Sequence, residues 1–223
     1  MVLVQKLIAQ PRLIALLSGL VFPFAIAPFF IWPIAILSLM GLLFCLHNSS
    51  AKEAAIRTWF FGFGKFSVGV SWIYVSMHDH GGTPAVLAIF MVGLFAAFLA
   101  TFPALFMLFF QRFYNQKYHE PIISILAFAA LWFAYEWFRS WFLTGFPWLF
   151  AGDAQLYTWL NGWAPILSVY GLSFFTALSA AAIYFSLRNR KIHYLIFLIV
   201  WPIGFFLQSI SWTEVTNELK VSA

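Results

Sequence analysis

The sequence contains little charge and almost no cysteine. Only 9% of its 223 residues are charged, whereas 63% are hydrophobic. Soluble domains normally carry about 25% charged residues, so this chain has too few to cover a surface in contact with water. A water-soluble globular protein is therefore excluded. The single cysteine, Cys45, excludes an internal disulfide, and with no base directed at it we interpret it as a packed or lipid-facing thiol.

Acidic residues are also few. Seven Asp and Glu residues face 12 Lys and Arg residues, which gives a net charge of +5. Such an excess of positive charge could bind nucleic acid. However, nine of the 12 cations lie in the N-terminal segment and in connections between apolar runs. This placement indicates membrane topology, and we expect no nucleic-acid partner.

Long apolar runs are abundant. They predict an all-α fold, a polytopic transmembrane helical bundle with about seven spans, because about 20 helical residues cross a hydrocarbon core of about 30 Å. The first two runs are short, and the prolines near their junction predict a pinched helical hairpin. The runs cover 13–30, 32–46, 59–77, 84–110, 121–141, 162–187 and 193–211.

Positive charge occurs in alternate connections. Lys and Arg precede the first run and follow the second, fourth and sixth, whereas connections 77–83 and 140–161 contain none. The positive-inside rule therefore predicts a cytoplasmic N-terminus and places both uncharged connections outside. The longer one, 140–161, is named the outer segment below.

Three charged residues lie within or at the edge of predicted spans: Lys65, Glu136 and Arg139. Charge inside a membrane usually faces a partner or a watery cavity. Glu136 and Arg139 are three residues apart and share a helix face. They predict either a structural ion pair at the outer interface or the polar floor of a lipid-headgroup site. We expect Lys65 to have a structural role, with its ammonium reaching the cytoplasmic side.

Two further motifs allow alternatives. The histidines of His78-Asp79-His80 could bind a metal only in an extended loop, and no third ligand is apparent nearby. We therefore expect a polar turn and no metal site. The outer segment is long for a helix connection and rich in aromatic residues. It is either an aromatic anchor at the interface or a lipid-binding mouth.

Several segments together resemble one family, the apolipoprotein N-acyltransferases. The matches run in order along almost the whole chain. They are APF at 27–29 with WP at 32–33, GVSWIYVS at 69–76 with HDHGG at 78–82, WFRSWFLTGFPW at 137–148, NGWAP at 161–165 and VYGLSF at 169–174.

This resemblance implies a multi-pass enzyme of the bacterial inner membrane that acts in lipoprotein maturation. Its phospholipid donor supplies an acyl chain to the N-terminal diacylglyceryl-cysteine of a lipoprotein acceptor, and no cofactor is expected. The family forms a thioester on a catalytic cysteine, with a glutamate as base and a lysine that stabilises the oxyanion. These residues belong to a nitrilase-like extracytoplasmic domain. Gly145 and Trp148 match positions near the active-site entrance, and we group Glu136 and Arg139 with them.

The chain departs from the family pattern after the seventh run. We expect residues 1–212 to form the transmembrane domain and 213–223 to begin a truncated nitrilase-like domain. No catalytic residue is then predicted in this chain, which we expect to be inactive alone and to need a separately encoded catalytic domain as a partner, besides membrane lipids. The alternatives are a non-enzymatic membrane remnant or scaffold and an unrelated transporter.

Overall fold

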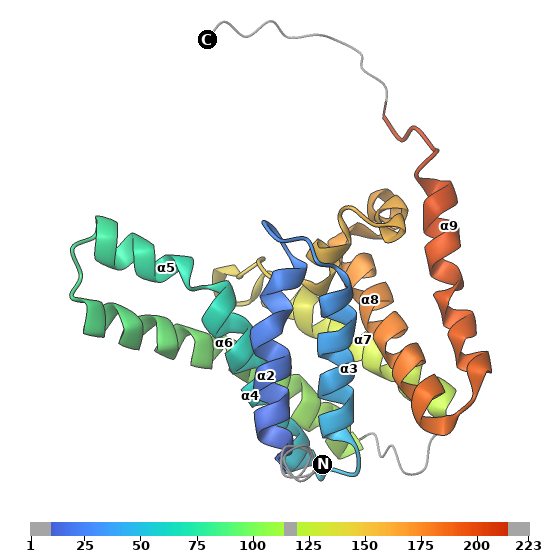
Figure 1. The fold of residues 1–223 in the computed structure, drawn as a ribbon, viewed down its shortest axis with the longest axis horizontal. Coiled ribbons are helices and arrows are strands. Elements are labelled where there is room, and N and C mark those ends of the chain that lie inside the picture. Colours follow the sequence, from blue (N-terminus) through green and yellow to red (C-terminus); the bar gives the residue numbers. More distant parts are fainter. Residues whose placement is uncertain (1–9, 114–119, 214–223) are drawn as a thin grey trace, which may run out of the picture.

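A computed structural model describes residues 10–113 and 120–213, and every regular element in these two ranges is a helix (Figure 1). The α-helices are α2 (Pro11–Val21), α3 (Pro33–Leu46), α4 (Ala51–Gly69), α5 (Trp72–Val75), α6 (Ala85–Phe113), α7 (Pro121–Arg139), α8 (Ala164–Asn189) and α9 (Val200–Leu207). The short helices are η1 (Phe22–Ala25), η2 (Ser76–His80), η4 (Phe142–Thr144), η5 (Ala151–Gln155), η6 (Trp159–Trp163) and η7 (Ile192–Ile199). The all-α prediction is confirmed for the described residues.

Local signals explain where the helices begin. Pro11, Pro33 and Pro121 occupy the first position of α2, α3 and α7. Proline suits this position because its missing N–H would have no partner there. Helix α4 instead begins after Ser50, whose hydroxyl accepts a hydrogen bond from the backbone N–H of Glu53 at 3.3 Å.

Helix length supports membrane crossing for part of the bundle. Three segments are both long and apolar enough to span a membrane: Ala85–Arg112, Pro121–Arg139 and Trp159–Asn189. Pro11–Ala25, Pro33–Leu46 and Ile192–Leu207 are apolar but shorter. The first two of these form the expected helical hairpin, with α2 against α3 (Figure 1, blue). The number of seven spans remains a prediction.

The run 59–77 is not one continuous helix, contrary to our prediction. Helix α4 ends at Gly69, and the chain changes direction before α5. Elements α5, η2 and the first part of α6 project from the bundle as an arm (Figure 1, green). The helix continues through His80, so the expected polar turn is shorter than predicted. The apolar pattern of the run does not indicate this break.

Helices α2 and α4 approach each other closely because both carry glycine at the contact. A Cβ on Gly19 would overlap the Phe61 carbonyl oxygen, and one on Gly64 would overlap the Leu16 carbonyl oxygen. Small residues allow this backbone approach in membrane bundles, where van der Waals packing drives association. The contact holds α4 against the hairpin and positions Lys65 inside the bundle.

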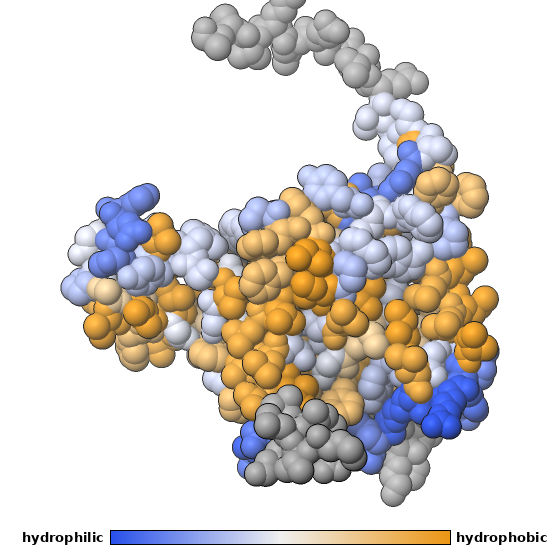
Figure 2. All heavy atoms as spheres, viewed as in Figure 1, coloured by the Kyte–Doolittle hydropathy of each residue, from blue (hydrophilic) through white to orange (hydrophobic). Residues whose placement is uncertain are grey.

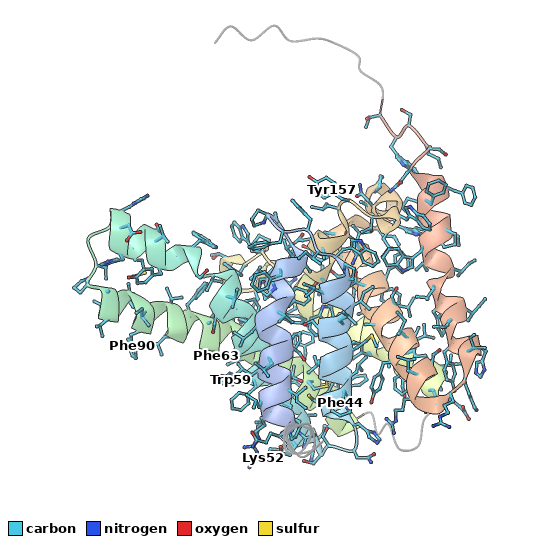
Figure 3. The ribbon with its side chains drawn as sticks, in the orientation of Figure 1. Phe44, Lys52, Trp59, Phe63, Phe90 and Tyr157 are labelled. Carbon is cyan, nitrogen blue, oxygen red and sulfur yellow. The ribbon has the colours of Figure 1, made fainter. Side chains whose placement is uncertain are left out.

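Large apolar side chains cover much of the outer surface. Figure 2 shows a broad hydrophobic surface over the helices, with hydrophilic patches toward the two ends of the bundle. Phe90 (labelled in Figure 3), Ile192 and Phe206 are among the exposed apolar residues. A surface of this kind requires lipid as its solvent.

Candidate functional site

The outer segment connects α7 to α8 through η4, η5 and the start of η6. It lies at the end of the bundle where α2 and α3 are joined, and Tyr157 packs against Phe30 of that junction with ring centroids 4.8 Å apart (Figure 3). Phe44 and Lys52 mark the opposite end (Figure 3). The segment therefore covers one end of the bundle, next to the buried charges of Lys65, Glu136 and Arg139.

Gly145 makes a turn that other residues do not readily adopt. Its φ is 83° and its ψ is 155°, a combination found almost only at glycine. A Cβ at this position would overlap the Ser140 carbonyl oxygen and lie 2.6 Å from the Ser140 carbonyl carbon. Leu143, Thr144 and Leu149 also have positive φ. This concentration of unusual backbone is typical of a functional loop that its surroundings hold in place.

Arg139 supports this turn from below. Its Nη1 donates a hydrogen bond to the Phe146 carbonyl oxygen at 2.5 Å, and its guanidinium carbon lies 4.7 Å from the centroid of the Phe150 ring. The side chain is only 1% exposed. The planar guanidinium can both donate and stack, which lysine could not do in the same way. Arg139 thus joins the end of α7 to the residues that follow Gly145.

Glu136 joins three separate elements. Its carboxylate accepts hydrogen bonds from Trp132 Nε1 at 2.9 Å and from the Ala151 backbone N–H at 3.0 Å. The Lys65 ammonium of α4 lies 3.5 Å from the same carboxylate. Both charged side chains are at most 1% exposed. Glu136 therefore fixes α4 and the start of η5 to α7.

One hydrogen bond attaches η5 to α8, and another lies within the outer segment. The Gly152 backbone N–H donates to Ser173 Oγ at 2.8 Å, and Asp153 accepts from the Phe150 backbone N–H at 2.8 Å. Burial raises the pKa of Asp153 to about 6, against the opposing effect of the Phe150 hydrogen bond. The second half of the outer segment is thus tied to two helices through short, buried hydrogen bonds.

Trp148 is exposed at the end of this fixed turn. About 54% of its surface is accessible, and its ring packs only in part, against Phe146, with centroids 5.2 Å apart. Trp141 and Trp159 are exposed to a similar degree. Trp159, however, packs against Phe205 of α9. An indole with a free face and an N–H suits the boundary between acyl chains and headgroups.

Two of the expectations for the buried charges are wrong. Lys65 does not reach the cytoplasmic side, because it is 1% exposed and faces Glu136. The ion pair of Glu136 is formed with Lys65, while Arg139 binds the Phe146 carbonyl oxygen. All four predicted site residues belong to one region, but sequence reasoning missed Lys65, Trp132 and the backbone of η5. The only sequence signal for this contact was the position of Lys65 inside an apolar run, where a charge normally needs a partner.

The histidine motif lies away from this region, in the arm. His78 Nδ1 is 2.8 Å from the Thr83 carbonyl oxygen, and Nε2 is 4.0 Å from Asp79. Within 10–113 and 120–213, no three metal-ligating side chains come together. The His78 ring also packs against Tyr74, with centroids 5.2 Å apart, so its contacts lie within the arm and give it a local structural role.

Comparison with known proteins identifies the family. Residues 18–182 match the model of the apolipoprotein N-acyltransferase N-terminal domain. Proteins named apolipoprotein N-acyltransferase from Pseudomonas paraeruginosa, Azotobacter vinelandii and Haemophilus influenzae are 43%, 42% and 36% identical over 94–95% of this chain. The chain spans only 41–43% of the length of these relatives. It belongs to the apolipoprotein N-acyltransferase family and contains that family's N-terminal domain.

Proposed function

We propose that this chain is the membrane part of an apolipoprotein N-acyltransferase of the bacterial inner membrane. The complete enzyme would transfer an acyl chain from a phospholipid to the N-terminal diacylglyceryl-cysteine of a lipoprotein. Relatives with this name and a predominantly apolar surface support the proposal. The one cysteine of the chain, Cys45, is buried, so a nucleophile would come from a catalytic domain that completes the site.

The outer segment forms the entrance through which the acyl donor reaches that domain. The main observation is that exposed Trp148 lies between two buried supports: Arg139 bonds the turn around Gly145 at Phe146, and Glu136 bonds the start of η5 at Ala151. A simple interfacial anchor would need aromatic rings but no buried support. Preorganised support is useful when a substrate chain must be held in one place.

The membrane orientation that fits this role has seven spans, an interior N-terminus and an exterior outer segment. The charge asymmetry of the connections supports it. In a Cys45→Ser background, a cysteine introduced at Thr83 should react with an impermeant thiol reagent in intact spheroplasts. A cysteine at Ser49 should react only after permeabilisation. The reverse labelling pattern would contradict the orientation.

Trp148→Ala tests the entrance. In an enzyme reconstituted with a nitrilase-like catalytic domain, we expect turnover to fall by about tenfold to a hundredfold, because the acyl chain loses its packing surface and is misplaced. Membrane insertion should be unchanged, since the side chain is largely exposed. The measurement is formation of the amide product from labelled phospholipid and a diacylglyceryl-cysteine peptide.

Trp159→Ala is the matched control for this substitution. Trp159 belongs to the same segment and has the same 54% exposure, but it packs against α9 and should leave turnover close to that of the original enzyme. Equal effects of the two substitutions on turnover would favour the alternative, in which the outer segment is only an aromatic anchor at the membrane interface.

The chain without a catalytic domain should form neither the amide nor an acyl-enzyme. A stable thioester on Cys45 would refute this part, and no stimulation by any catalytic domain would favour a scaffold.

A further inference from the structure

An open cavity lies at the end of the bundle opposite the outer segment. It has a volume of about 530 Å³ and lies between the start of α7 and η7, within the size range of small-molecule sites. Ile192 and Ile196 remain 81% and 67% exposed, so no described side chain fills the space. The lining residues are Ile122, Ile192, His193, Tyr194, Ile196 and Phe197. We call this cavity the η7 groove.

Positive charge borders the η7 groove. Arg190 ends α8 in the left-handed conformation, with φ 54°, and the backbone N–H of Lys191 donates to the Ser186 carbonyl oxygen at 3.2 Å. This turn places two exposed cations directly before Ile192. Figure 2 shows the corresponding hydrophilic patch immediately below the hydrophobic surface of η7 and α9.

The two cations differ from their neighbour Arg188, which already has partners. Arg188 lies 2.7 Å from His47 Nε2 and contacts the Tyr184 hydroxyl. The ion pairs found within the described ranges involve neither Arg190 nor Lys191. Glu120, at the N-cap of α7, is the acidic group closest in sequence to the groove lining. Arg190, Lys191 and Glu120 together carry a net charge of +1.

We propose that the η7 groove binds a phospholipid with an anionic headgroup. The apolar lining suits an acyl chain, and Arg190 and Lys191 at the rim suit the phosphate of an anionic lipid, whose negative charge no choline cation offsets. Basic pockets between membrane helices bind anionic headgroups in this way. This lipid is separate from the acyl donor proposed for the outer segment, because the two sites lie at opposite ends of the bundle. It would be a bound structural lipid.

Native mass spectrometry of the complete chain in non-ionic detergent tests this proposal. Dioleoyl-phosphatidylglycerol and dioleoyl-phosphatidylcholine are titrated in parallel, and the anionic lipid should bind more tightly. Arg190→Asn/Lys191→Gln should weaken phosphatidylglycerol binding by about thirtyfold, since each surface cation contributes on the order of fivefold. Phosphatidylcholine binding should not change. Asn at position 190 suits the left-handed conformation and so preserves the turn.

Two comparisons separate this site from general effects. Lys52→Gln/Arg112→Gln removes the same charge from exposed positions outside the groove lining and should leave lipid preference unchanged. Ile196→Gln changes only the apolar lining of the groove and should weaken the binding of both lipids equally. Equal binding of the two lipids by the original chain, or an equal loss in the control pair, would overturn the proposal. So would displacement by soluble glycerol phosphate, which indicates an anion site alone, or a dimer that forms through the same residues.

Discussion

Replacing Glu136 with alanine is expected to lower the free energy of unfolding by about 3–5 kcal/mol, because removing one partner leaves the other charge buried without compensation. The remaining charge is the Lys65 ammonium, which is 1% exposed. Trp132 Nε1 and the Ala151 backbone N–H lose their acceptor in the same change. Denaturant titration of the purified chain in mixed micelles, followed by Trp fluorescence, would measure the loss.

A double-mutant cycle separates the charge from the hydrogen bonds. Lys65→Met/Glu136→Gln removes both charges but keeps an amide oxygen that can accept from Trp132 and Ala151. The double variant should therefore recover much of the stability that Glu136→Ala loses, and the two single changes should not be additive. Additive effects would mean that Lys65 and Glu136 act independently.

Glu53→Ala provides the control at an exposed ion pair. Glu53 bonds Arg12 at 2.8 Å, but the two side chains are 35% and 53% exposed. Arg12 also lowers the pKa of Glu53 through this hydrogen bond. Solvent screens such pairs, so this substitution should change stability far less than Glu136→Ala. Equal effects at the two positions would argue against a special role for the buried network.

The starts of several helices can be predicted from local sequence, whereas the break between α4 and α5 cannot. Proline at Pro11, Pro33 and Pro121 marks helix starts because of an effect within one turn. The break after Gly69 lies instead at a tertiary contact, because a Cβ on Gly69 would meet the Leu149 side chain. The two residues are 80 positions apart in sequence, so no local pattern could reveal the contact.

The same distinction applies to the candidate site. The spacing of Glu136 and Arg139 correctly placed both on one end of α7, but helical spacing cannot show which partner each side chain prefers. Lys65 is 71 residues from Glu136, and the Phe146 carbonyl oxygen reaches Arg139 only because the outer segment folds back. Buried charges were recognisable as unusual. Their pairing depended on tertiary contacts between α4, α7 and η5.

Gly145→Ala is expected to have the second large effect. The alanine would have to keep the positive φ of Gly145. Its methyl group would also overlap the Ser140 carbonyl group, which is backbone and cannot rotate away. The strained conformation alone costs about 1–3 kcal/mol. Relief of the overlap must then move the turn that carries Trp148. In the reconstituted enzyme, a shift of about 1 Å should reduce turnover by about a hundredfold, measured as amide product per minute.

Gly82→Ala is the control for a positive φ without a steric overlap. Gly82 also has a positive φ, 65°, but no atom lies within 4 Å of the position that its Cβ would occupy. An alanine there therefore carries the conformational strain without a steric overlap, and its stability loss should be about 1–2 kcal/mol. Gly145→Ala should lose clearly more in the same denaturant titration. If the two variants unfold at the same denaturant concentration, the contact between Gly145 and Ser140 does not constrain the turn, and the outer segment is not held as rigidly as we infer.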